Sequence, residues 1–222
     1  MSHPKHHDHD HDHDHDHDHD HKPIESQQEP AGEERFLEQA LRELLDEKGV
    51  VTAAQIAQQI DIQDSRTPAL GAKVVAKAWV NPSFKQDLLA APLETINKTF
   101  GLTINTPLEL VVLENTPDVH NMVVCTLCSC YPRMLLGIPP AWYKSTDYRS
   151  RVVIEPRAVL KEFGAHISDE TEIRVSDSTA DVRYLVLPLR PQGTDMFTEA
   201  QLEALVTRDT MIGTAVPKLM ES

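Results

Sequence analysis

The chain has 222 residues, 40% of them hydrophobic and 25% charged, with a formal net charge of −14. Residues 1–22 carry −5 of this charge and the remainder carries −9, so the acidity extends along the chain. We therefore expect no nucleic-acid partner, because binding the phosphate backbone requires clustered Lys and Arg. No apolar run approaches the roughly 20 residues that cross a bilayer, so we expect no membrane partner and a cytoplasmic location.

The N-terminal segment is a low-complexity run in which His and Asp mostly alternate from His6 to His21. Such a segment cannot bury a core, so we predict a disordered tail over residues 1–32. Imidazole beside carboxylate is a loose ligand set for divalent cobalt, nickel or zinc. Two interpretations stay open: a tail that captures metal before delivering it, and a tail that only increases solubility or derives from expression.

Residues 33–107 have helical patterns and form a predicted arm. A first apolar stripe begins at Phe36 and is stopped by Gly49, and a second covers residues 69–80. Asn81 and Pro82 are the N-cap and first residue of a third helix, and a fourth covers residues 93–100 before Gly101. We predict that this arm packs on a partner subunit, with packing on its own body as the alternative.

The sequence pattern of residues 108–222 predicts an α+β domain. The predicted strands are residues 110–113, 119–124, 172–175 and 182–187, the first two joined by a turn over 115–118. A helical stretch runs from Tyr148 to Gly164 with an interruption near Pro156, and Thr198 with Gln201 forms a capping box for a last helix that reaches Val206. The expected fold class is α+β: a helical arm, then a layered α-β-β-α body with helices outside the strands.

All three cysteines of the chain lie within six residues, as Cys125, Cys128 and Cys130. A cluster this tight is a poor disulfide framework, because stabilising bridges usually close long loops. Three sulfur atoms on one loop are better suited to binding one metal ion. The third cysteine is so close to the second that the amide nitrogens of Ser129 and Cys130 come within bonding reach. Amides lose protons only to a strongly polarising ion, which favours a trivalent metal with one open position for a substrate or water.

Three other interpretations of the cysteines stay open. A structural zinc site would need a fourth ligand, for which His120 is the nearby residue. A redox CxxC pair usually opens a helix in a βαβ unit, which this context does not resemble. Buried inert cysteines would not be expected to cluster so closely.

The seven residues from Val124 to Cys130 (VCTLCSC) resemble the metal-binding loop of nitrile hydratase α subunits and of their close relative, the thiocyanate hydrolase γ subunit. The resemblance extends over about residues 34–217. The further matching segments are 72–80 (AKVVAKAWV), 112–117 (VLENTP), 136–144 (LGIPPAWYK), 148–152 (YRSRV) and 208–213 (RDTMIG).

The resemblance implies a non-corrin Co(III), or less readily Fe(III), bound by the three cysteine sulfurs and the amides of Ser129 and Cys130. Thr126 resembles the cobalt type. Cys125 would stay a thiolate, Cys128 would become a sulfinic acid and Cys130 a sulfenic acid, which are early steps of cysteine oxidation. The implied reaction hydrates a small nitrile to its primary amide, with Cys130 and Ser129 as the catalytic residues.

The resemblance also implies partners and supporting residues. The partners are a β subunit, giving an αβ unit that dimerises to α2β2, and an activator protein for metal insertion. Asp177, Asp181 and Arg183 match positions that hydrogen-bond around the loop, although Asp181 replaces the usual Glu.

One position departs from the nitrile hydratase pattern. Arg133 stands where many nitrile hydratases have Trp and resembles the thiocyanate hydrolase subunit, which keeps the hydrolysis of thiocyanate to carbonyl sulfide and ammonia as an alternative function. A non-catalytic cobalt-binding protein is a second alternative. We expect Trp142 and Tyr143 to lie in the core.

Overall fold

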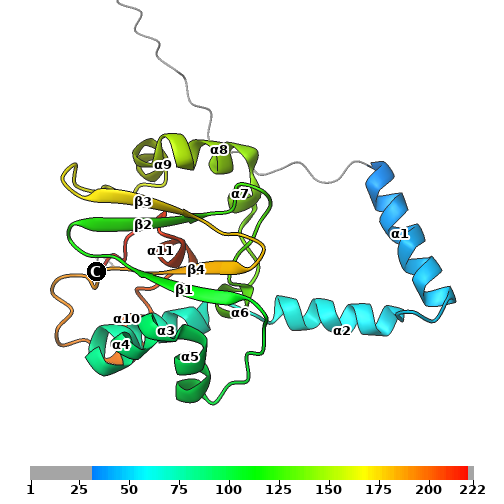
Figure 1. Cartoon of the computed structure of the whole chain (residues 1–222), viewed down its shortest axis with the longest axis horizontal. Helices are drawn as coiled ribbons and strands as arrows, with labels where there is room; N and C mark the ends of the chain where they lie inside the picture. The colour runs from blue at the N-terminus through cyan, green and yellow to red at the C-terminus, as the bar shows by residue number, and fades with distance from the viewer. Residues whose placement is uncertain (1–31, 220–222) are drawn as a thin grey trace, which may run out of the picture.

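The computed structural model describes residues 32–219, which form an α+β body and two N-terminal helices that project from it (Figure 1). These helices are α1 (Gly32–Glu47) and α2 (Ala53–Asp64), and neither contains a buried residue. The predicted tail lies outside the described residues, apart from Gly32, and its disorder and metal capture stay predictions. Within the described part of the chain, no helix is both long and apolar enough to cross a membrane.

The described part of the chain contains four strands, which form two parallel pairs. β1 (Glu109–Glu114) pairs with β4 (Val182–Leu187), and β2 (Val119–Val124) pairs with β3 (Glu172–Asp177). The turn between β1 and β2 therefore joins strands of different pairs, and each pair is closed by a long crossover, as parallel pairing requires. The register of the second pair sets Val124 opposite Asp177, which brings the end of β3 beside the start of the cysteine loop.

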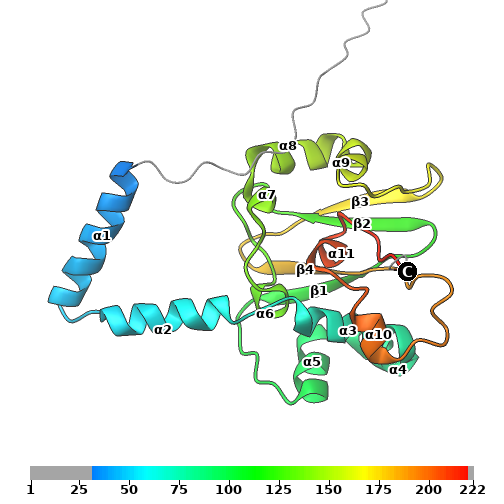
Figure 2. The same ribbon diagram turned by 180° about the vertical axis from the view of Figure 1, so that it is seen from behind.

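Helices cover the outer side of each strand pair (Figures 1 and 2). In both views the order is a helical layer, the β3–β2 pair, the β4–β1 pair and a second helical layer, and the α-β-β-α prediction is confirmed. The first layer contains α8 (Thr146–Ile154) and α9 (Pro156–Glu162). The second contains α3 (Ala69–Val80), α4 (Pro82–Ala90), α5 (Pro92–Phe100) and α10 (Glu199–Glu203). Three short helices complete the body: α6 (Arg133–Leu136), α7 (Ala141–Lys144) and α11 (Arg208–Ile212).

The core joins α3 to the strands. Val74 and Val75 of α3 are fully buried in the same hydrophobic cluster as Met122 and Leu185. The Trp79 side chain, near the end of α3, donates from Nε1 to the Pro188 carbonyl over 2.7 Å. Residues 33–107 thus differ in burial: α3–α5 share the core of the body, whereas α1 and α2 do not. Packing of this segment on a partner stays a prediction.

The element boundaries agree with the sequence patterns where caps or stops are strong. Asn81 caps α4 through its side chain, and Gly101 ends α5 in the left-handed conformation. The last predicted helix, α10, is shorter than expected and ends at Glu203 rather than at Val206. Among residues 32–219, four helices were not predicted: α2, α6, α7 and α11. The capping box of Thr52 and Gln55 was a usable signal for α2.

We predict that Gly213→Ala destabilises the fold by about 3 kcal/mol. Gly213 has a φ of 90°, and a Cβ built on it would lie 2.0 Å from the Asn121 backbone oxygen. Gly164→Ala is the matched control, because Gly164 has a φ of 73° but open space around its Cβ position. The control should lose only about 1 kcal/mol from backbone strain. Urea unfolding of both variants measures the difference, and equal losses would contradict the close approach at Gly213.

Candidate metal centre

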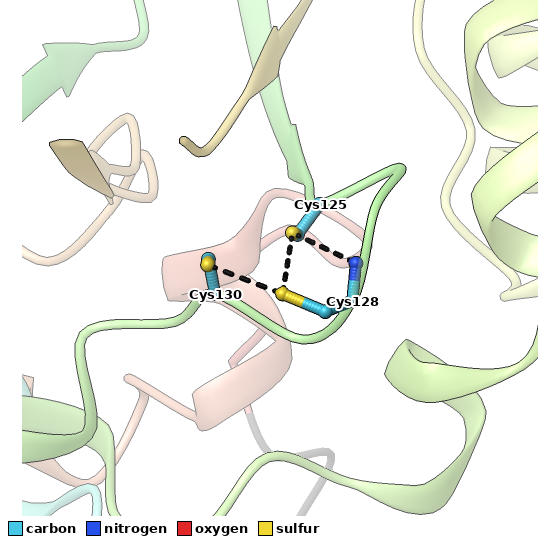
Figure 3. Close-up of side chains that lie close together, drawn as sticks. All are labelled: Cys125, Cys128 and Cys130. Carbon is cyan, nitrogen blue, oxygen red and sulfur yellow. Dashed lines mark hydrogen bonds between the residues drawn. The ribbon is translucent and has the colours of Figure 1, made fainter. Parts of the chain in front are cut away.

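The cysteine loop begins where β2 ends and brings its three sulfur atoms together (Figure 3). The three Sγ atoms all lie within 4.8 Å of one another. Cys125 is buried in the core, Cys130 is half-buried and Cys128 is exposed. The Cys128 amide donates to the Cys125 sulfur over 3.3 Å, which closes the first turn of the loop. The loop therefore offers three soft donors from one side, with a buried and an exposed edge.

The separations of the sulfur atoms are those of ligands that could share one ion. Cys128 Sγ lies 3.5 Å from Cys125 Sγ and 3.3 Å from Cys130 Sγ. At a metal–sulfur distance of about 2.3 Å, two sulfurs are about 3.3 Å apart at a right angle and about 3.8 Å apart at the tetrahedral angle. The observed values lie within this range, so the sulfurs are close enough to bind one shared ion.

The pKa values within the cluster are shifted in opposite directions. Hydrogen bonds from the Cys130 and Cys125 thiols lower the pKa of Cys128 to about 7. Burial, with further contributions from Cys128 and Cys125, raises the pKa of Cys130 to about 12. Three sulfurs this close cannot all be thiolates at neutral pH unless a cation compensates their charge. Burial thus keeps Cys130 a thiol in the free protein, and a cation bound between the sulfurs would stabilise the thiolate forms.

Asp177 fixes the start of the loop. Its Oδ1 accepts from the Thr126 amide over 2.9 Å, and its Oδ2 accepts from the Thr126 hydroxyl over 2.5 Å. The pairing of β3 with β2 supplies this position, because Asp177 is the last residue of β3 and faces Val124. The structure therefore brings this predicted supporting residue into contact with the loop.

The other predicted site residues are Ser129, Arg183 and Asp181. Ser129 is half-buried between the second and third cysteines. Arg183 donates to the carbonyl of Thr179, in the turn before β4, and to that of Val182, the first residue of β4. Its charge lowers the pKa of Cys130 against the larger effect of burial. Asp181 is exposed in the same turn. Its amide donates to the Thr179 hydroxyl, and its carbonyl accepts from the Glu109 amide. The structure does not bring the Asp181 carboxylate to the loop.

A cavity of about 730 Å³ opens onto the loop. Cys128, Ser129 and Cys130 form part of its wall. Three arginines also line it, and they come from separate parts of the chain: Arg66 after α2, Arg133 in α6 and Arg183 in β4. The cavity wall thus combines part of the cysteine loop with three arginine residues.

Two residues that hold the loop were not identified from the sequence as functional. Arg149 of α8 places Nη1 3.5 Å from the carbonyl oxygens of both Thr126 and Cys128. The Tyr143 hydroxyl donates to the Cys130 carbonyl over 3.0 Å. Tyr143 lies in the core as expected, with Trp142 packed against the same cluster. Because both contacts are made to backbone carbonyls, no motif of side-chain types predicts them.

His120 does not complete a zinc site. Its Nε2 donates to the Gly213 carbonyl over 2.7 Å, and its Nδ1 accepts from the Asn115 amide over 3.2 Å. Burial lowers its pKa, so the ring is neutral and both nitrogens are engaged in the core. Among the described residues, the grouped metal-ligating side chains are the three cysteines alone. The zinc interpretation therefore lacks its fourth ligand.

Comparison with known proteins identifies one family over most of the chain. The model of the nitrile hydratase alpha chain matches residues 33–215. The α subunit of the low-molecular-weight cobalt-containing nitrile hydratase of Rhodococcus rhodochrous is 50% identical over 179 residues, covering 80% of this chain and 86% of the relative. The γ subunit of thiocyanate hydrolase from Thiobacillus thioparus is 46% identical over 194 residues, covering 82% and 79%.

A solved structure agrees with this assignment. A double mutant of the Fe-type nitrile hydratase from Comamonas testosteroni Ni1 superposes with a TM-score of 0.79 at 42% identity. The match covers 86% of this chain and 92% of that one. The fold and the sequence therefore point to the same family, whose similar members include both cobalt and iron proteins.

We predict that Asp177→Ala lowers metal affinity by roughly 10- to 100-fold, because the Thr126 end of the loop loses both of its anchoring bonds. Asp181→Ala is the matched control: it removes an exposed carboxylate from the next turn and should change affinity by less than about twofold. Cobalt retained per chain against a chelator series measures both. Equal retention by the two variants would contradict the role of Asp177.

Proposed function

We propose, from the premise that this chain belongs to the nitrile hydratase α-chain family, that it is the α subunit of a cobalt-type nitrile hydratase. In that role it hydrates a small nitrile to the primary amide. The observation that carries the proposal is the convergence of the Cys125, Cys128 and Cys130 sulfurs on one side of a loop that faces a cavity.

The residues of this chain have separate roles in binding the metal and in meeting the substrate. The three cysteine sulfurs and the amide nitrogens of Ser129 and Cys130 hold the ion. Cobalt bound there supplies a Lewis acid that polarises a nitrile or an attacking water. Cys130 and Ser129 lie on the cavity wall, where they meet the substrate. Cys128 as a sulfinic acid and Cys130 as a sulfenic acid would present oxygen atoms to that substrate, and Arg183 supplies positive charge at the same wall.

Cobalt rather than iron is the proposed metal. Support comes from Thr126 between the first two cysteines, a feature of the cobalt type, and from similar relatives described as cobalt-containing. Asp177 engages both the amide and the hydroxyl of Thr126, so this residue is fixed within the loop.

A β subunit is the proposed partner, with an αβ unit that dimerises to α2β2 and an activator protein that inserts the metal. Support comes from α1 and α2, which project from the body without a buried residue (Figure 2). Large apolar side chains are exposed along them: Phe36, Leu37, Leu41, Leu44, Ile60 and Ile62. Several large apolar side chains left exposed on two projecting helices are typical of a protein interface. A cytoplasmic location is part of the same proposal.

Thiocyanate hydrolysis is the second candidate function, and one observation favours it. Arg66, Arg133 and Arg183 line the cavity at the cysteine loop, and three guanidinium groups suit an anion such as thiocyanate better than a neutral nitrile. The similarity to a thiocyanate hydrolase γ subunit agrees with this alternative.

The test is co-expression of the chain with its partner subunits in cobalt medium, followed by metal analysis, intact mass and turnover of acrylonitrile and thiocyanate. We expect one cobalt per chain, oxidised Cys128 and Cys130, and amide formed from the nitrile without loss of thiocyanate. The Arg133→Gln variant separates the two candidates. If thiocyanate is the substrate, loss of this charge should lower its kcat/KM by about tenfold or more.

Turnover of the nitrile should change by less than about threefold in Arg133→Gln, since a neutral substrate gains little from the charge. Thiocyanate consumption without amide formation would overturn the first candidate in favour of the second. Tetrahedral zinc with neither activity would overturn both and support a non-catalytic metal-binding chain.

A further inference from the structure

A buried tyrosine holds the end of the cysteine loop. Tyr143 of α7 is fully buried, and its hydroxyl donates to the Cys130 carbonyl over 3.0 Å. Burial raises the pKa of Tyr143 well above that of a free phenol, so the hydroxyl keeps its proton and remains a donor at physiological pH. The backbone of the third cysteine is thus tied to the core of the body.

The ring of Tyr143 is itself fixed by aromatic packing. Its centroid lies 5.3 Å from that of Tyr131, 6.0 Å from that of Trp142 and 5.7 Å from that of Tyr148. Edge and tilted contacts of this kind restrain a ring on several sides. The position of the hydroxyl, and of the loop carbonyl bonded to it, is therefore set by the core.

Arg149 acts on the middle of the same loop. It lies one turn into α8, and its Nη1 approaches the carbonyl oxygens of Thr126 and Cys128. The Cys128 carbonyl and the Ser129 amide nitrogen belong to one planar peptide group, so a contact with the first also orients the second. Side chains of α7 and α8 thus engage the carbonyls of residues 126, 128 and 130 from one side.

We propose that Tyr143, assisted by Arg149, is a positioning residue that holds the Cys130 backbone so that its sulfur meets those of Cys125 and Cys128. Without the hydroxyl, the Cys130 carbonyl has lost its buried donor and turns toward water, and the Cβ and sulfur move with it. This inference rests on the proposed function only in that the assembled cluster binds a metal. The hydrogen bonds that support it all lie within this chain.

Tyr148 supplies a matched control. It is also fully buried, and its hydroxyl donates to a backbone carbonyl, that of Val123, over 2.8 Å. Val123 lies within β2, whose backbone is already fixed by pairing with β3. Phe at either position removes one hydroxyl from the same aromatic cluster and leaves one carbonyl without its donor. Only Tyr143→Phe releases the loop.

The experiment compares the full-length chain with its Tyr143→Phe and Tyr148→Phe variants, each reduced and treated with chelator. An aromatic disulfide reagent reports thiol reactivity, and peptide mapping assigns it to each cysteine. We expect Cys130 to react about fivefold faster in Tyr143→Phe, as loss of one hydrogen bond predicts, and at the parent rate in Tyr148→Phe. Arg149→Met tests the same anchoring should Tyr143→Phe not fold.

A second readout uses the chains assembled with partner subunits in cobalt medium. The cobalt content and the sulfur-to-cobalt absorption band should fall in Tyr143→Phe and not in Tyr148→Phe. If the parent binds cobalt and both variants match it in metal and thiol reactivity, the inference fails while the proposed function stands. Equal losses in both variants also overturn it, since they show general destabilisation. If the parent binds no cobalt, the proposed function fails and the thiol rates still decide the role of Tyr143.

Discussion

The parallel pairing of β2 with β3 sets Asp177 opposite Val124, one residue before the first cysteine. A strand register cannot slip by one residue without reversing the facing of every side chain, so this position is strongly specified. The Asp177 carboxylate can then satisfy both the amide and the hydroxyl of Thr126, and the loop leaves the sheet in a defined direction. The convergence of the sulfurs follows from a constraint in the sheet rather than from the loop sequence alone.

The cluster also carries an electrostatic conflict that the fold does not remove. Cys125 is packed into the hydrophobic core, and the pKa of Cys130 is raised by burial, so the surroundings disfavour three negative charges. Protonation of the thiols resolves this conflict, and so does a bound cation. The strands on one side and α7–α8 on the other keep the sulfurs close together, which is how a site is preorganised for one ion.

The sequence patterns predicted the four described strands and the longer helices other than α2, because caps, glycine stops and β-branched runs mark those elements directly. The cysteine cluster was equally evident, since ligand type and spacing are sequence properties. Asp177 was inferred by resemblance, and only the strand register explains its role physically. Single-turn helices such as α6 and α7 carry too few residues for a period to be visible.

The contacts of Tyr143 and Arg149 could not be predicted from the sequence, for a different reason. Both end on backbone carbonyls, and every residue has one, so no pattern of side-chain types indicates which carbonyl is engaged. The pairing of β1 with β4 rather than with β2 was equally hidden, because a short turn between two strands does not determine whether they become neighbours.

The projecting helices end next to the cavity that serves the metal centre. Gln63, near the end of α2, and Arg66, just beyond it, are part of the cavity wall. The backbone of Arg66 lies so close to Gly137 that a methyl group there would not fit. The chain that leaves α2 is therefore both the base of the projecting helices and a piece of the cavity rim, held in place by its close approach to Gly137.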